Sequence, residues 1–100
     1  MKVTTLDEIV EPLKQKKKFF RERFGVTRMG VFGSFVQGRQ LVTSDIDIVI
    51  EMEKGRKNLH NFLGLKRFLE NEFQRSVDLG FEHTLKPIVS EKLKGKIVYV

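Results

Sequence analysis

Ser44-Asp45-Ile46-Asp47-Ile48-Val49-Ile50 is the stretch that decides how this chain is organised. Its three isoleucines alternate with Asp45, Asp47 and Val49, which is the period-two pattern of a β-strand with one apolar face. Residues two apart on a strand point the same way and lie about 7 Å apart along it. The pattern therefore predicts a strand from Asp45 to Met52 that buries its isoleucines and presents two carboxylates on the other face.

A glycine–serine turn comes shortly before this strand, in Phe32-Gly33-Ser34-Phe35. The preceding residues, Arg28 to Phe32, have the composition of a strand, and residues 34–40 are expected to form a short helical turn and a loop. A glycine lets the backbone approach a phosphate group closely, and a serine hydroxyl with nearby N–H groups can bind phosphate oxygens. Gly33 and Ser34 are therefore candidate phosphate-binding residues.

A third carboxylate, Asp78, lies in Ser76-Val77-Asp78-Leu79, which is expected to form a third strand. If that strand pairs beside the first, Asp78 joins Asp45 and Asp47 on one face of the sheet. Mg²⁺ prefers oxygen ligands and is commonly held by one or two carboxylates together with substrate phosphates. Two such ions about 4 Å apart could hold the attacking and leaving oxygens of a phosphoryl-type displacement. Asp78 could complete one metal site or accept the proton of an attacking hydroxyl.

The alternative for these aspartates is structural. Asp45 could cap a turn, and Asp47 could be an ordinary residue on the solvent side of a half-buried sheet. The combination of strand, glycine–serine turn, paired aspartates and a third aspartate on a strand favours the metal–phosphate interpretation over this one.

The remaining segments predict helices on either side of these strands. Thr5 to Glu8 fits a capping box, Pro12 predicts a kink or two short helices, and Gly25 is a good helix end. Asn58 can cap a helix with an apolar stripe. The stripe residues are Leu59, Phe62, Leu63, Leu65, Leu69 and Phe73.

A last helix is expected from Thr84, with Pro87 in its first turn, followed by an extended tail or edge strand from Ile97 to Val100. The order is helix, strand, strand, helix, strand, helix. It predicts a single domain over residues 1–100 of the α+β (α/β-like) class, with a small mixed sheet of three to four strands flanked by helices.

Composition narrows the classes of function. The chain has 100 residues, no cysteine and a net charge of +6. It contains no apolar stretch near the ~20 residues that span a bilayer, and no secretory signal pattern at its beginning. We therefore expect a cytoplasmic protein without a membrane association.

The basic residues from Lys14 to Arg23 could attract phosphate, nucleic acid or an acidic protein, or could form a solvated helix face. No aromatic residues alternate with the lysines, which disfavours direct nucleic-acid binding.

These motifs together resemble the signature of the DNA polymerase β-like nucleotidyltransferase superfamily. More narrowly, the chain is similar over nearly its whole length to the minimal nucleotidyltransferases (MNT), the antitoxins of HEPN/MNT toxin–antitoxin pairs. The similarity also includes Phe24-Gly25-Val26, Gly64-Leu65-Lys66, Val77-Asp78-Leu79 and the closing Val98-Tyr99-Val100.

The resemblance implies a Mg²⁺-dependent, two-metal enzyme that transfers AMP from ATP to a hydroxyl, tyrosine being the expected one, of a HEPN ribonuclease toxin. It assigns the metal-ligand and catalytic roles to Asp45, Asp47 and Asp78, and triphosphate contacts to Gly33 and Ser34. Members often have Ala-Arg-Gly after the glycine–serine pair, whereas this chain has Val36-Gln37-Gly38, with Arg39 one place later. Arg39 is therefore the candidate substitute for the triphosphate-binding arginine.

Two other functions remain open from the sequence. The chain could neutralise its partner by binding alone, with weak or no catalysis, through its basic helix and through phenylalanines outside the inward stripes, namely Phe19, Phe35 and Phe68. It could also bind nucleic acid through Lys14 to Arg23. His60 and His83 are expected at the surface or in packing, and Tyr99 in packing or in a contact of a homo-oligomer.

Overall fold

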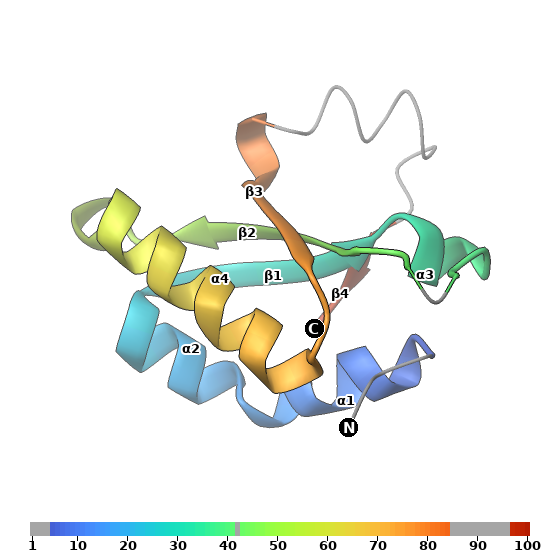
Figure 1. Cartoon of the computed structure of the whole chain (residues 1–100). Helices are drawn as coiled ribbons and strands as arrows, with labels where there is room; N and C mark the ends of the chain where they lie inside the picture. The colour runs from blue at the N-terminus through green and yellow to red at the C-terminus, as the bar shows by residue number, and fades with distance from the viewer. Residues whose placement is uncertain (1–4, 42, 85–96) are drawn as a thin grey trace.

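The computed structural model describes residues 5–41, 43–84 and 97–100. Within these ranges the labelled elements are the helices α1 to α4, the 3₁₀ helix η1 and the strands β1 to β4, and residues 82–84 are also helical (Figure 1). In chain order they are α1 (Asp7–Gln15), α2 (Lys17–Phe24), β1 (Val26–Phe32), α3 (Ser34–Gln37), β2 (Ile46–Met52), η1 (Lys54–Arg56), α4 (Leu59–Phe73), β3 (Val77–Phe81) and β4 (Val98–Tyr99).

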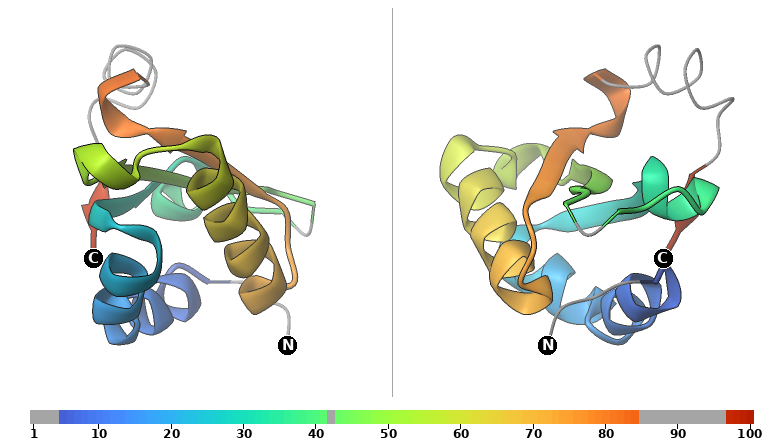
Figure 2. Two further views of the ribbon diagram at one scale, coloured as in Figure 1. Left: turned by 90° about the vertical axis from the view of Figure 1, so that its left-hand side faces the viewer. Right: turned by 45° about the vertical axis from the view of Figure 1, so that its right-hand side comes forward.

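The strands form one mixed sheet in the order β3-β2-β1-β4. β1 is antiparallel to both β2 and β4, whereas β2 and β3 are parallel. Helices α1, α2 and α4 lie on one face of the sheet (Figures 1 and 2). We call the opposite face the distal face. The predicted α+β class with a mixed sheet of three to four strands is confirmed. The helix expected to start at Thr84 begins earlier than predicted, because Glu82, His83 and Thr84 are already helical, and its expected course past Thr84 lies outside the described residues.

The predicted interruption near Pro12 is confirmed as two short helices, but they separate at Lys16 rather than at the proline. The amide of Lys16 still donates to the carbonyl of Pro12 at 3.1 Å, so the last turn of α1 forms before the chain changes direction. Gly25 ends α2 in the left-handed region at φ 76°, a conformation that favours glycine.

The core lies between the sheet and the three helices. Ile46, Ile48 and Ile50 are fully buried there, as the alternating pattern predicts. Three expectations about apolar residues were wrong. Leu59, in the predicted stripe, is 70% exposed because it lies in the first turn of α4, before the helix reaches the core, and Leu63 of the same stripe is 40% exposed. Phe35, expected outside the core, is buried, because α3 turns its side chain into the core cluster.

No helix in the described residues is long and apolar enough to cross a membrane.

Candidate functional site

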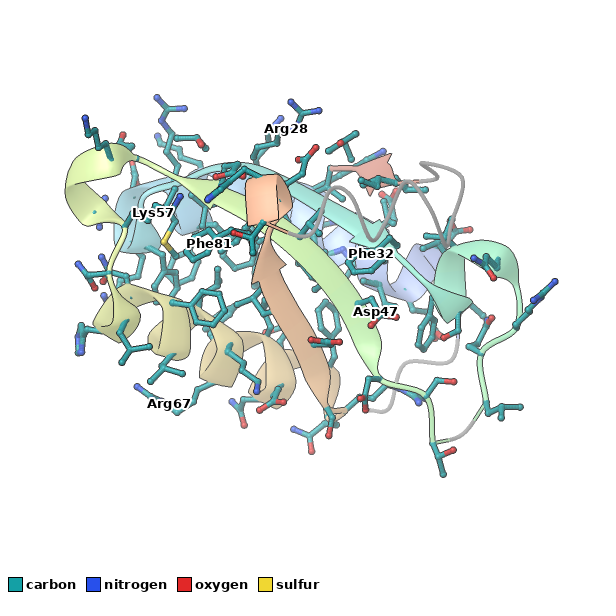
Figure 3. All side chains as sticks on the ribbon, turned by 90° about the horizontal axis from the view of Figure 1, so that it is seen from above. Arg28, Phe32, Asp47, Lys57, Arg67 and Phe81 are labelled. Atoms are coloured by element: carbon teal, nitrogen blue, oxygen red, sulfur yellow. The ribbon has the colours of Figure 1, made fainter. Side chains whose placement is uncertain are left out.

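Strand pairing brings the predicted aspartates together on the distal face. Asp47 of β2 is the direct partner of Asp78 in the parallel β2–β3 pair, so their side chains project from the same face. Asp45 precedes Asp47 by two residues, just before β2 begins. Figure 3 views the molecule from the side opposite the helices. In this view Asp47 lies near Phe32, the last residue of β1. The sheet thus gathers three carboxylates from two adjacent strands.

The glycine–serine turn lies directly beside them. Phe32 pairs with Asp47 in the β1–β2 ladder, so Gly33 and Ser34 follow at the same end of the sheet. Gly33 has φ 81° and precedes α3, whose first turn closes when the amides of Val36 and Gln37 donate to the Gly33 carbonyl, both at 3.1 Å. A Cβ at position 33 would lie 2.8 Å from the Cγ of Asp47 and would clash with its Oδ2. Glycine is therefore required both by the backbone and by the adjoining carboxylate.

The surroundings of Asp47 perturb the pKa of its carboxyl group. Its pKa rises from the ordinary value of 3.8 to about 6, chiefly because of burial and also because of the negative charges of Asp78 and Asp45, while a hydrogen bond from the Ser34 amide opposes the rise. Burial and like charges both favour the protonated form of an acid. A bound cation would relieve this repulsion, so the electrostatics fit a site for positive charge.

The three carboxylates offer only oxygen donors, which suits a hard divalent cation. Their side chains do not form a ready-made metal site, however. Across the described part of the chain, no three Asp, Glu or His side chains are grouped so that they could hold a metal ion. Asp45 and Asp78 are exposed, and Asp47 accepts the Ser34 amide. The metal-ligand roles of Asp45, Asp47 and Asp78 therefore stay predictions.

Arg75 is a supporting residue that the sequence reasoning missed. Its guanidinium Nη1 donates to the Ser44 carbonyl at 2.8 Å and to the Leu41 carbonyl at 3.2 Å, and it lies over the Phe35 ring at 5.2 Å. These contacts join the start of β3 to the loop that leads into Asp45. An arginine immediately before the third predicted strand was the available signal, but only the fold shows which carbonyls it reaches.

The loop also closes on itself. The Leu41 amide donates to the Ser44 Oγ at 2.7 Å, and the Ser44 amide donates back to the Leu41 carbonyl at 3.0 Å. Ser44 therefore fixes the turn before Asp45, which is a structural role for the serine of the Ser-Asp-Ile-Asp motif.

The candidate phosphate-binding arginine is less well defined. Arg39 follows Gly38, which ends α3 at φ 72°, and its amide donates to the Ser34 carbonyl at 2.9 Å. The side chains of both Arg39 and Gln37 are exposed. The backbone of Arg39 is thus tied to the glycine–serine turn, and the triphosphate contact of its side chain stays a prediction.

A second polar cluster lies toward the other end of the distal face. His83 Nδ1 is 2.9 Å from the Glu51 carboxylate, and the Lys57 ammonium lies 3.8 Å from the same group. The Tyr99 hydroxyl donates to Glu82 Oε2 at 2.7 Å. As expected, His83 lies at the surface, and Tyr99 makes a packing contact within the chain. Both connect the residues after β3 to neighbouring strands.

The family follows from comparison with known proteins. The model of the nucleotidyltransferase domain matches residues 13–100. The chain belongs to this family. Protein adenylyltransferase MntA of Thermococcus cleftensis is 39% identical over 100 residues, which cover the whole of both chains. Protein MJ1379 of Methanocaldococcus jannaschii is 32% identical over 98 residues, covering 96% of this chain and 98% of the relative.

Solved structures agree with this assignment. A minimal nucleotidyltransferase superposes with a TM-score of 0.67 and 29% identity, covering 89% of this chain and 93% of the other. A toxin–antitoxin structure with AMP-PNP superposes with a TM-score of 0.65 at 19% identity, covering 86% of this chain and 70% of the other, and so shows the shared fold. The expectation of a minimal nucleotidyltransferase enzyme is thereby confirmed.

Proposed function

We propose that this nucleotidyltransferase transfers AMP from ATP to a tyrosine hydroxyl of a HEPN ribonuclease toxin and so acts as its antitoxin. The observation that carries the proposal is the pairing of Asp47 with Asp78 beside the Gly33–Ser34 turn. The similarity to a protein adenylyltransferase over the whole chain supports AMP transfer to a protein. The fold shared with a toxin–antitoxin structure supports a toxin as the acceptor.

In this proposal Asp45, Asp47 and Asp78 would hold Mg²⁺, and Gly33 and Ser34 would contact the triphosphate with help from Arg39. Bound Mg²⁺ would neutralise charge on the phosphates and on the departing pyrophosphate. Asp78, the more exposed partner of the Asp47–Asp78 pair, would also accept the proton of the attacking hydroxyl. The new bond joins that oxygen to the α-phosphorus, and the bond from the α-phosphorus to the bridging oxygen breaks. Catalysis would rest on positioning and charge neutralisation.

Label transfer tests the proposal. The purified protein is incubated with ATP labelled at the α-phosphate, Mg²⁺ and a HEPN ribonuclease as the candidate acceptor. We expect label on the partner, located at a tyrosine by mass spectrometry. The Asp45→Asn/Asp47→Asn variant should transfer none while keeping the circular dichroism spectrum of the parent. Transfer that is unchanged in this variant would rule the proposal out.

Neutralisation by binding alone is the second candidate. The presence of Gln37 where relatives of this type often have arginine favours it, as does the lack of a ready-made ligand set in the described residues. In that case the Asp45→Asn/Asp47→Asn variant would still protect RNA from the partner ribonuclease. If the variant fails to protect RNA but still forms the complex, catalysis is the neutralising step.

A further inference from the structure

A groove of about 400 Å³ lies far from the carboxylates, between the N-terminal part of β1 and the helices α1 and α2. Its apolar lining includes Leu13 and Phe20 from the helices and Val26 and Met29 from β1. Val100, directly after β4, also lines it. In the left view of Figure 2 the C-terminus lies beside α2 and above α1, at this edge of the sheet.

The edge of β1 is open at this groove. β4 pairs with Gly30 and Val31 only, and the Val100 amide adds one hydrogen bond to the Met29 carbonyl at 3.0 Å. Among the described residues, no strand pairs with Val26–Arg28 on the β4 side of β1. A bulge also leaves Thr27 outside the pairing with β2, and Thr27 lines the groove. An unpaired strand edge beside an apolar groove is the geometry that accepts an added strand.

The charged side chains that line the groove are all basic among the described residues. Lys14, Lys17, Lys18 and Arg21 line it, their side chains are exposed, and the described residues include no ion pair to any of them. A fifth cation, Arg28, also lines the groove and is paired with Glu82 at 3.2 Å. Among the described residues, no aspartate or glutamate side chain lines the groove. Such a rim repels basic segments and attracts acidic ones.

We propose that this groove binds an extended acidic segment of a partner protein, which adds as a strand along the unpaired edge Val26–Arg28. Apolar side chains of the segment would face the lining between α1, α2 and β1, and its carboxylates would face the four unpaired cations. A nucleic acid fits the charge but not the apolar lining or the open strand edge. The proposal does not depend on the chemistry of the carboxylate site, because β1 separates the two regions by most of its length.

Peptide binding to the full chain tests this inference. The probe is a fluorescein-labelled peptide of alternating glutamate and valine, followed by fluorescence anisotropy. Controls are the same peptide with N-methylated backbone amides, a lysine–valine peptide, a single-stranded oligothymidine and phosphatidylserine-containing vesicles. We expect saturable binding of the acidic peptide alone, with the largest NMR shifts at Thr27 and Arg28. N-methylation should abolish binding, because it removes the hydrogen bonds of an added strand.

Charge reversal locates the site. Lys17→Glu/Lys18→Glu should weaken peptide binding at least ten-fold, whereas the matched pair Lys54→Glu/Arg67→Glu, exposed elsewhere, should change it less than two-fold. Any of four results would overturn the proposal. The two double variants could lose the same peptide affinity, or the oligothymidine or the vesicles could bind more tightly than the peptide. The N-methylated peptide could bind as well as the parent peptide, or the parent peptide could fail to bind at ~1 mM.

Discussion

At the scale of single residues, the charge on Asp47 is unfavourable for the free protein. Its folded pKa of about 6 lies above its ordinary value of 3.8. Between these pH values the folded protein keeps a proton that the unfolded chain has released. The stability that this proton contributes is complete below about pH 4 and is lost as the pH rises through 6. In the proposed mechanism, the charge that Asp47 needs at neutral pH would therefore destabilise the fold until a cation binds.

Asp47→Asn removes the negative charge that lowers the free energy of unfolding at neutral pH. Without divalent metal at pH 7.5, the variant should be more stable than the parent by about 1 kcal/mol, a value reduced for partial solvent exposure. At pH 4 the two should be nearly equal. Urea unfolding at both pH values in the presence of EDTA measures the difference. Asp7→Asn, at the exposed start of α1, is the control. A parent more stable than Asp47→Asn at pH 7.5 would contradict the electrostatic account.

The contact between Gly33 and Asp47 can be separated from backbone strain. Gly33 and Gly38 both have positive φ, 81° and 72°, but a Cβ at Gly38 meets nothing within 4 Å. Gly38→Ala should therefore cost only the strain of a left-handed alanine, about 1 kcal/mol. Gly33→Ala should cost about 2 kcal/mol more, because it also displaces the Asp47 carboxylate. It should abolish nucleotide binding as well.

Thermal unfolding and calorimetric titration with an ATP analogue measure both effects. Equal losses of stability in the two variants would mean that the close approach of Gly33 to Asp47 has no energetic weight.

At the scale of elements, Arg75 links β3 to the loop before β2. Arg75→Gln should lower the free energy of unfolding by about 1–2 kcal/mol, because two carbonyls lose a charged donor. It should also raise the KM for ATP more than it lowers kcat, since Asp45 follows the released loop. Arg67→Gln, on the exposed side of α4, should change neither by a measurable amount. An unchanged KM in Arg75→Gln would show that the loop holds its position by itself.

Individual helices and strands also show which structural features could be predicted from the sequence alone. Period-two alternation predicts β2, and the glycine at position 25 and the asparagine at position 58 predict helix ends that the structure confirms. The Asn58 Oδ1 accepts the Asn61 amide at 2.8 Å, as a capping residue should. These signals are local, so a single stretch of sequence contains them.

What the sequence could not supply is tertiary. The parallel register that places Asp78 opposite Asp47 depends on how α4 connects β2 to β3. The reach of Arg75 to carbonyls 31 and 34 residues earlier is equally non-local. The burial of Phe35 depends on the direction in which α3 leaves Gly33, and no periodicity in four helical residues indicates it.

At the scale of the whole molecule, the carboxylate site and the basic groove lie toward opposite ends of β1. A substitution in one region should therefore lower the affinity for the ligand of that region only. Lys17→Glu/Lys18→Glu should leave the affinity for an ATP analogue within two-fold of the parent while it weakens peptide binding. Asp45→Asn/Asp47→Asn should do the reverse. Isothermal titration of each variant with each ligand measures this. A loss of both affinities in either variant would mean that the two regions are coupled through the sheet.

The most direct test of the central claim, that three carboxylates and one turn form a single metal–nucleotide site, is paramagnetic NMR. Mn²⁺ is added with a non-hydrolysable ATP analogue, and amide line widths are followed. The account predicts selective broadening at Gly33, Ser34, Ile46 and Leu79, with Thr27 unaffected, and loss of the effect in Asp45→Asn/Asp47→Asn. Broadening centred elsewhere, or the same broadening in the variant, would contradict it.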